Sequence, residues 1–106
     1  MERKEKEING TTHVAVLVSH GFGAGWYSWN RDLVKLVFDP RIVDLLERGD
    51  IKGIETYCEK EYPHTYLGGL DGLCIYWIPK GSKFRIKEYD GAEGLELLED
   101  IDLLTA

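Results

Sequence analysis

The clearest strand signal is the first apolar run of the chain. His13–Val18 is short, rich in β-branched residues and apolar on both faces, which predicts a central strand of a sheet. Residues 1–12 before it are highly charged and are expected to form a flexible lead-in. The predicted organisation is therefore a lead-in over 1–12 and one globular α+β domain over 13–106.

A helical pattern marks the middle of the chain. Asp39 is a residue of the N-cap type, and Pro40 suits the first helical position. Gly49 is placed as the cap at the C-terminal end. The apolar stripe between these signals consists of Ile42, Val43, Leu45 and Leu46. Together they predict one helix from Pro40 to the residue before Gly49.

Two further helices are predicted beside this one. Asn30 can cap a short helix over 31–37, and Asp50 can cap a third helix that Pro63 ends. Gly53 weakens the pattern of the third helix, because glycine disfavours a helix interior. Its apolar face is formed by Ile51, Ile54, Cys58 and Tyr62.

The last third of the chain has the alternation of strands. Strands are predicted over 73–78 and 83–87, joined by a turn at 79–82. Asp90-Gly91 is a two-residue hairpin signal, and residues 95–98 then return as a third strand, with helix as the alternative. The fold class that follows is α+β, with a small, mostly antiparallel sheet of about four strands and two to three helices packed on one face.

The net charge of −6 has a distinctive placement. Residues 1–88 contain 13 basic and 13 acidic side chains, so the six acids of residues 89–106 account for all of the excess. An acidic chain disfavours stable nucleic-acid binding, which needs a basic surface. The acidic end could bind a basic partner or mimic a nucleic acid, and the alternative is a solvated face of a strand or helix.

The sequence favours a soluble protein of the cytoplasm, without a membrane segment. The apolar run Val14–Val18 is far too short to span a bilayer, and the charged N-terminus lacks the apolar core of a signal peptide. Cys58 and Cys74 are therefore expected to be reduced, packing thiols. His13, His20 and His64 are scattered, so neither a metal site nor a cofactor is predicted.

The stretch from Ser19 to Asn30 is the most unusual part of the chain, because glycines and large aromatics alternate in it. A strand that runs into His20-Gly21-Phe22-Gly23 is similar to the oxyanion loop of α/β-hydrolases, but the chain has no Gly-x-Ser-x-Gly elbow and is too short for that fold. Trp26 stands where the third glycine of a dinucleotide fingerprint belongs, and the P-loop pattern is absent.

Two interpretations of this stretch remain open. Its glycines can expose backbone N–H groups that hold an anion, and its aromatic rings can stack on a flat ligand. Alternatively, the glycines allow tight turns and the tryptophans are core residues. His20 could act as a general base or a polar contact, although no carboxylate lies near it in sequence.

A second candidate surface is the predicted hairpin around Asp90-Gly91. Arg85, Lys87 and Tyr89 alternate onto one of its faces, where a phosphate or carboxylate could bind. The alternative is an edge strand that its cations keep soluble. The predicted ligand-binding residues are His20, Gly21, Phe22, Gly23, Gly25, Trp26, Trp29, Asn30, Arg85, Lys87 and Tyr89.

Three blocks of sequence resemble a family of short proteins of tailed bacteriophages and related bacterial elements. They are Gly21–Trp26 with Trp29-Asn30, Phe38–Val43, and Phe84–Ile86 with Glu88–Gly91. The resemblance covers the chain from about Thr12 onward and implies no activity, cofactor or catalytic residue. It does imply a phage context, in which small acidic proteins often counter host defences.

The predicted function is that of a small non-enzymatic binding protein of phage type. It would act against host defence, either by sequestering a nucleotide-like signal or by blocking a host immune protein. One alternative is an assembly protein that forms a homo-oligomer without a ligand. Another is a small hydrolase of phosphorylated or nucleotide substrates, with His20, Asp90 and Glu93 as its polar groups.

Overall fold

The structure is a computed structural model, which describes residues 3–20, 26, 34–63, 70–89 and 92–97. No helix within these ranges is long and apolar enough to cross a membrane. The described residues form three α-helices and five strands, and a 3-10 turn, η1 (Leu70–Gly72), precedes the third strand. The helices and strands, in chain order, are β1 (Glu5–Ile8), β2 (Thr11–Ser19), α1 (Lys35–Phe38), α2 (Pro40–Glu47), α3 (Ile51–Glu61), β3 (Leu73–Pro79), β4 (Phe84–Tyr89) and β5 (Ala92–Leu97).

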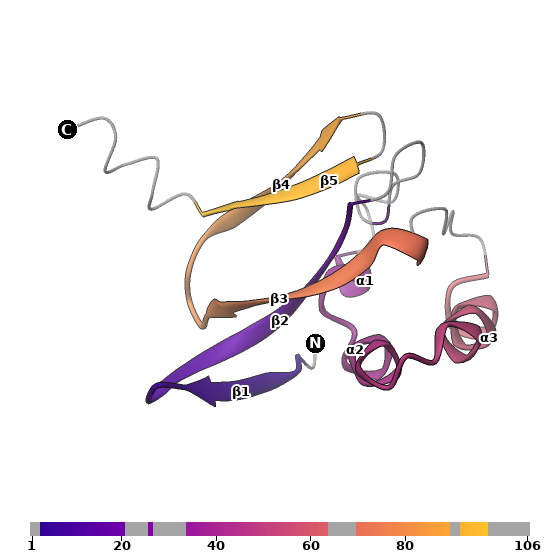
Figure 1. Cartoon of the computed structure of the whole chain (residues 1–106), viewed down its shortest axis with the longest axis horizontal. Coiled ribbons are helices and arrows are strands. Elements are labelled where there is room, and N and C mark those ends of the chain that lie inside the picture. The colour runs from indigo at the N-terminus through magenta and orange to yellow at the C-terminus, as the bar shows by residue number, and fades with distance from the viewer. Residues whose placement is uncertain (1–2, 21–25, 27–33, 64–69, 90–91, 98–106) are drawn as a thin grey trace.

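The predicted α+β class is confirmed, but the strands form two sheets and not one. β1, β2 and β3 form an antiparallel sheet in that order, and β4 and β5 form a separate hairpin. Figure 1 shows the hairpin and the helices α2 and α3 on opposite sides of β2 and β3. Tyr89 pairs with Ala92, which is the register that a hairpin turn at Asp90-Gly91 predicts; residues 90–91 themselves lie outside the described residues.

The two apolar faces of β2 explain why two layers pack against it. Ala15 and Leu17 belong to the core cluster that the helices share, together with side chains of β3. Val14, Val16 and Val18 belong to a second cluster with the hairpin residue Ile86. Side chains alternate across a strand, so β2 buries one row under the helices and the other under the hairpin.

The prediction of a flexible lead-in over residues 1–12 is wrong for residues 5–8. They form β1, which pairs with β2 from Glu5 opposite Val14 to Ile8 opposite Thr11. The turn between them is Asn9-Gly10, with φ values of 51° and 80°. Asn-Gly readily adopts positive φ at both positions and is a strong hairpin signal, so the sequence did contain the information.

Side chains of β1 also hold it on the sheet. The ammonium of Lys6 lies 4.1 Å from the centre of the Trp77 ring, in a cation–π contact. Lys80 forms an ion pair with Glu5 at 3.0 Å. The charged side chains of Glu5 and Lys6, which had suggested a flexible segment, therefore contact residues beyond their own strand.

The predicted helix signals are confirmed where they fall on described residues. The Asp39 carboxylate accepts the Arg41 N–H at 2.9 Å at the start of α2, and Asp50 accepts the Gly53 N–H at 2.9 Å at the start of α3. Gly49 has a φ of 71° and ends α2. The short helix predicted over 31–37 is α1, which begins only at Lys35; residues 31–33 lie outside the described residues.

A buried carboxylate links the hairpin to the other sheet. Glu93 of β5 is 2% exposed and points inward. Its Oε1 accepts the N–H of Ser19 at 2.9 Å, and its Oε2 accepts the N–H of Trp26 at 3.1 Å. The carboxylate thus binds the end of β2 and the chain beyond it. Such charge-assisted hydrogen bonds are what make a buried charge tolerable.

We expect the substitution Glu93→Gln to destabilise the fold by about 1–3 kcal/mol, because a glutamine amide presents one acceptor where the carboxylate presents two. One buried N–H, of Ser19 or of Trp26, then loses its acceptor. The free energy of unfolding in urea measures the effect.

The matched control is Glu96→Gln on the same strand. Glu96 lies on the outer face of β5 and pairs with exposed cations, so its substitution should change the free energy of unfolding little. Equal stability of the Glu93→Gln variant and the wild-type protein would contradict the linking role of Glu93.

Candidate anion-binding groove

The structure describes five of the eleven predicted ligand-binding residues. Gly21, Phe22, Gly23, Gly25, Trp29 and Asn30 lie outside the described residues. Trp26 is described and is a core residue with 0% exposure. Its indole N–H donates to the carbonyl of Leu36 at 2.9 Å, and its backbone N–H is bound by Glu93. Its ring is thus not open to a ligand, which agrees with the packing alternative.

His20 is exposed at the end of β2, and its partner is a phenol. The hydroxyl of Tyr76 lies 2.7 Å from Nε2 of His20, and the two ring centres are 5.6 Å apart. Tyr76 belongs to β3, so the pairing of β2 with β3 brings the two residues together. No carboxylate of the described residues hydrogen-bonds to the His20 ring. The arrangement fits a polar contact better than a general base held by an acid.

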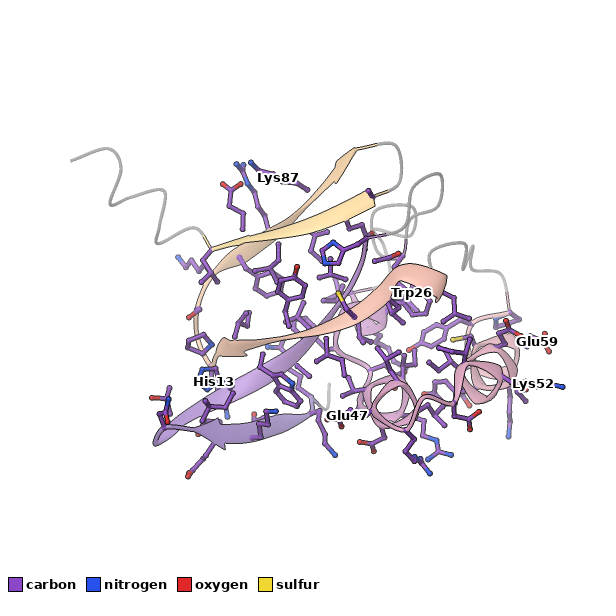
Figure 2. All side chains as sticks on the ribbon, in the orientation of Figure 1. His13, Trp26, Glu47, Lys52, Glu59 and Lys87 are labelled. Atoms are coloured by element: carbon purple, nitrogen blue, oxygen red, sulfur yellow. The ribbon has the colours of Figure 1, made fainter. Side chains whose placement is uncertain are left out.

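The cations of β4 lie on the outer face of the hairpin. Arg85 contacts Glu96 at 2.9 Å, and Lys87 forms an ion pair with the same carboxylate. Tyr89 lies two residues after Lys87 on β4, which is the same alternation along the strand, although its side chain lies outside the described residues. Figure 2 shows Lys87 pointing away from the fold and Trp26 inside it. His20, Trp26 and Arg85 therefore do not share one concave surface.

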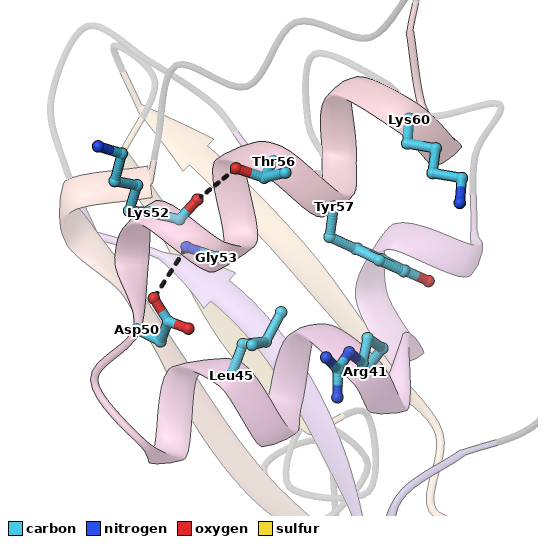
Figure 3. A pocket seen from close by; sticks show the side chains of 8 residues that line it. All are labelled: Arg41, Leu45, Asp50, Lys52, Gly53, Thr56, Tyr57 and Lys60. Carbon is cyan, nitrogen blue, oxygen red and sulfur yellow. Dashed lines mark hydrogen bonds between the residues drawn. The ribbon is translucent and has the colours of Figure 1, made fainter.

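A different part of the molecule has the character of a binding site. A groove of about 550 Å³ lies between α2 and α3 (Figure 3). It is lined by Arg41, Leu45, Asp50, Lys52, Gly53, Thr56, Tyr57 and Lys60. The sequence did not predict this groove, because its residues come from two helices, and neither helix sequence alone shows how the two pack together. The available signal was the spacing of Lys52, Thr56 and Lys60, which places them on one helix face.

A buried carboxylate positions the aromatic wall of the groove. Asp39, 5% exposed, accepts hydrogen bonds from the hydroxyls of Tyr57 at 2.9 Å and Tyr62 at 2.6 Å through Oδ2. Its Oδ1 caps α2. The hydroxyl of Tyr57 is therefore occupied, and the ring is the part of Tyr57 that the groove can offer. Burial, reinforced by the neighbouring Asp39 carboxylate, raises the pKa of Tyr57 and Tyr62 above the usual tyrosine range.

The groove has two chemically different ends. Arg41 and Lys60 flank Tyr57 at one end, and Asp50 and Lys52 lie at the other, as Figure 3 shows. Arg41, Lys52 and Lys60 are all exposed, and none of the ion pairs found in the described ranges includes them. Exposed cations beside the Tyr57 ring form a surface suited to an anion that also has an apolar part.

The groove offers little for catalysis. Burial raises the pKa of the Cys58 thiol, which belongs to the same helix, to about 12, so it is not a ready nucleophile. The Thr56 hydroxyl donates to the carbonyl of Lys52 at 3.1 Å. Among the residues that the structure describes, no group of three or more His, Cys, Asp or Glu side chains could hold a metal ion.

Comparisons of the chain with protein-family models, with curated proteins and with solved structures find no match. The resemblance to phage proteins stays a prediction, carried by the sequence blocks quoted above.

Because Tyr57 and Tyr62 both donate to Asp39, we expect the free energy of unfolding to fall at high pH. Their pKa is raised in the folded protein, whereas unfolded tyrosines ionise near pH 10, as tyrosines usually do. Above about pH 10 the unfolded state therefore binds fewer protons than the folded state, and the free energy of unfolding falls as pH rises. Their contribution is fully present below that pH.

The measurement is urea unfolding at a series of pH values from 8 to 11. The Tyr62→Phe variant should lose stability less steeply with pH than the wild-type protein, since one of the two phenols is gone. A slope that the substitution leaves unchanged would show that Tyr62 does not hold its proton in the folded state.

Proposed function

We propose that this chain is a small non-enzymatic binding protein that sequesters a phosphate-bearing small molecule in the groove between α2 and α3. The observation that carries the proposal is the gathering of Arg41, Lys52 and Lys60 around this groove without a carboxylate partner in the described ranges. The groove has a volume of about 550 Å³ and is shallow and open to solvent, so it suits a ligand that stays partly exposed.

Binding without turnover is supported by the side chains of the groove. The Tyr57 hydroxyl is bound to Asp39, and the Thr56 hydroxyl is bound to the helix backbone. Burial and the Asp39 carboxylate raise the pKa of Tyr57, so its phenol does not readily ionise to a nucleophile, and the Thr56 hydroxyl donates to a backbone carbonyl, which is not a base. What the groove does offer is positive charge, which holds an anion without chemistry.

The resemblance to phage proteins supports a biological role for this sequestration. A phage protein that removes a phosphate-bearing signal would weaken the host defence that the signal activates. The counter-defence role rests on that resemblance, whereas the binding proposal rests on the groove, so the two can be tested separately.

The test is a thermal-shift series with pyrophosphate, mononucleotides and cyclic dinucleotides, in which ligand integrity is followed by chromatography. A ligand that binds only the folded state raises the melting temperature. At a ligand concentration 100 times Kd, the free energy of unfolding rises by about 2.7 kcal/mol. We expect at least one compound to raise the melting temperature by several degrees and to stay intact. Turnover of the ligand would contradict a non-enzymatic role.

A matched pair of variants localises the site. Lys60→Gln removes a cation of the groove, and Lys83→Gln removes an exposed cation that lies outside it. The first should reduce the thermal shift and the second should leave it unchanged. Equal loss in both variants, or no shift with any anion, would overturn the proposal.

A further inference from the structure

We infer that the ligand is a nucleoside phosphate held in one orientation, with its phosphates between Arg41 and Lys60 and its nucleoside toward Asp50. This inference rests on the proposed function, because it assigns the two ends of the same groove. It starts from the difference in charge between the two ends in Figure 3: Arg41 and Lys60 are two cations at one end, whereas Lys52 is accompanied by the Asp50 carboxylate at the other.

The cationic end fits a phosphate group. Arg41 comes from the first turn of α2 and Lys60 from the last turn of α3, so the antiparallel packing of the helices places them across the groove. Arginine binds phosphate oxygens in a planar, two-pronged manner, and lysine adds a point charge. The described contacts leave both side chains without an ion pair.

The length of the groove favours a ligand larger than phosphate. Asp50 and Lys60 are ten residues apart, which corresponds to about 15 Å along a helix axis. One inorganic phosphate cannot contact both ends. A ligand that bridges them needs an anionic part and, some distance away, a part that a carboxylate can recognise.

The middle and the far end of the groove fit a nucleoside. The Tyr57 ring gives apolar surface above the buried Leu45, and hydrogen bonding to Asp39 fixes the ring, so it can contact a flat base without losing further freedom. At the far end, Asp50 uses Oδ1 to cap α3. A carboxylate is an acceptor only, and Oδ2 of this exposed residue can accept from a ribose hydroxyl or an exocyclic amino group.

The experiment is calorimetric titration of the full chain with four nucleoside diphosphates, those of adenosine, guanosine, cytidine and uridine, and with pyrophosphate. We expect at least one nucleoside diphosphate to bind ten or more times tighter than pyrophosphate. Lys60→Gln should weaken both kinds of ligand by a similar factor of about ten, because both use the phosphate end.

Substitution at the far end separates the two parts of the ligand. Asp50→Asn keeps an N-cap residue at the start of α3 but removes the carboxylate charge, so it should weaken the nucleoside diphosphate several-fold and leave pyrophosphate unchanged. The control Asp44→Asn removes a carboxylate that pairs with Lys4 outside the groove, and it should change neither affinity.

The outcomes distinguish this inference from the proposed function. If pyrophosphate binds as tightly as all four nucleoside diphosphates, the nucleoside assignment is overturned. The proposed function of the groove as an anion-binding site is then unaffected. Equal weakening of both ligands by Asp50→Asn would overturn the orientation. No binding of any of the five compounds would overturn this inference, whereas the proposed function would fall only if every anion of the thermal-shift series also failed to bind.

Discussion

The carboxylate of Glu93 is an anion that the protein carries inside its own fold, and the arrangement of the two sheets depends on it. Apolar contacts between the sheets are not directional, whereas this carboxylate binds two defined backbone N–H groups, at Ser19 and Trp26. These two residues bracket the glycine-rich stretch. One of the two interpretations of the stretch was that its N–H groups hold an external anion, and the N–H groups of Ser19 and Trp26 are bound to an internal one.

This internal anion changes where an external anion is expected to bind. The N–H groups of Ser19 and Trp26 are bound to Glu93, so they are not available to a phosphate at the end of β2. The groove between α2 and α3 is lined by three cations, Arg41, Lys52 and Lys60, and one carboxylate, Asp50. Among the described residues, the surface proposed for an anion therefore lies on the helices, although the glycine-rich stretch is the more conspicuous feature of the sequence.

Local signals predicted most of the elements, and non-local contacts decided the rest. Asp39, Gly49 and Asp50 act on backbone groups within a few residues, so the boundaries of α2 and α3 could be predicted from the sequence. The two apolar faces of β2 indicated burial on both sides, but not that a separate hairpin covers one of them. β2 also pairs with β3, which places His13 opposite Pro79. These residues are far apart along the chain, so no local pattern predicts the pairing. The missed strand β1 is different, because Asn9-Gly10 was a readable signal.

The groove could not be predicted, because a second buried carboxylate builds it from distant residues. Asp39 caps α2 through one oxygen and binds Tyr57 and Tyr62 of the α3 region through the other. Helix start, helix packing and the orientation of the Tyr57 ring thus depend on one side chain. The sequence identified Asp39 as a cap only, since its tyrosine partners lie 18 and 23 residues away. Because the cap of α2 also fixes the Tyr57 ring, the geometry of the groove depends on the same side chain as the packing of the helix pair, and the proposed binding of a ligand without rearrangement requires such a rigid wall.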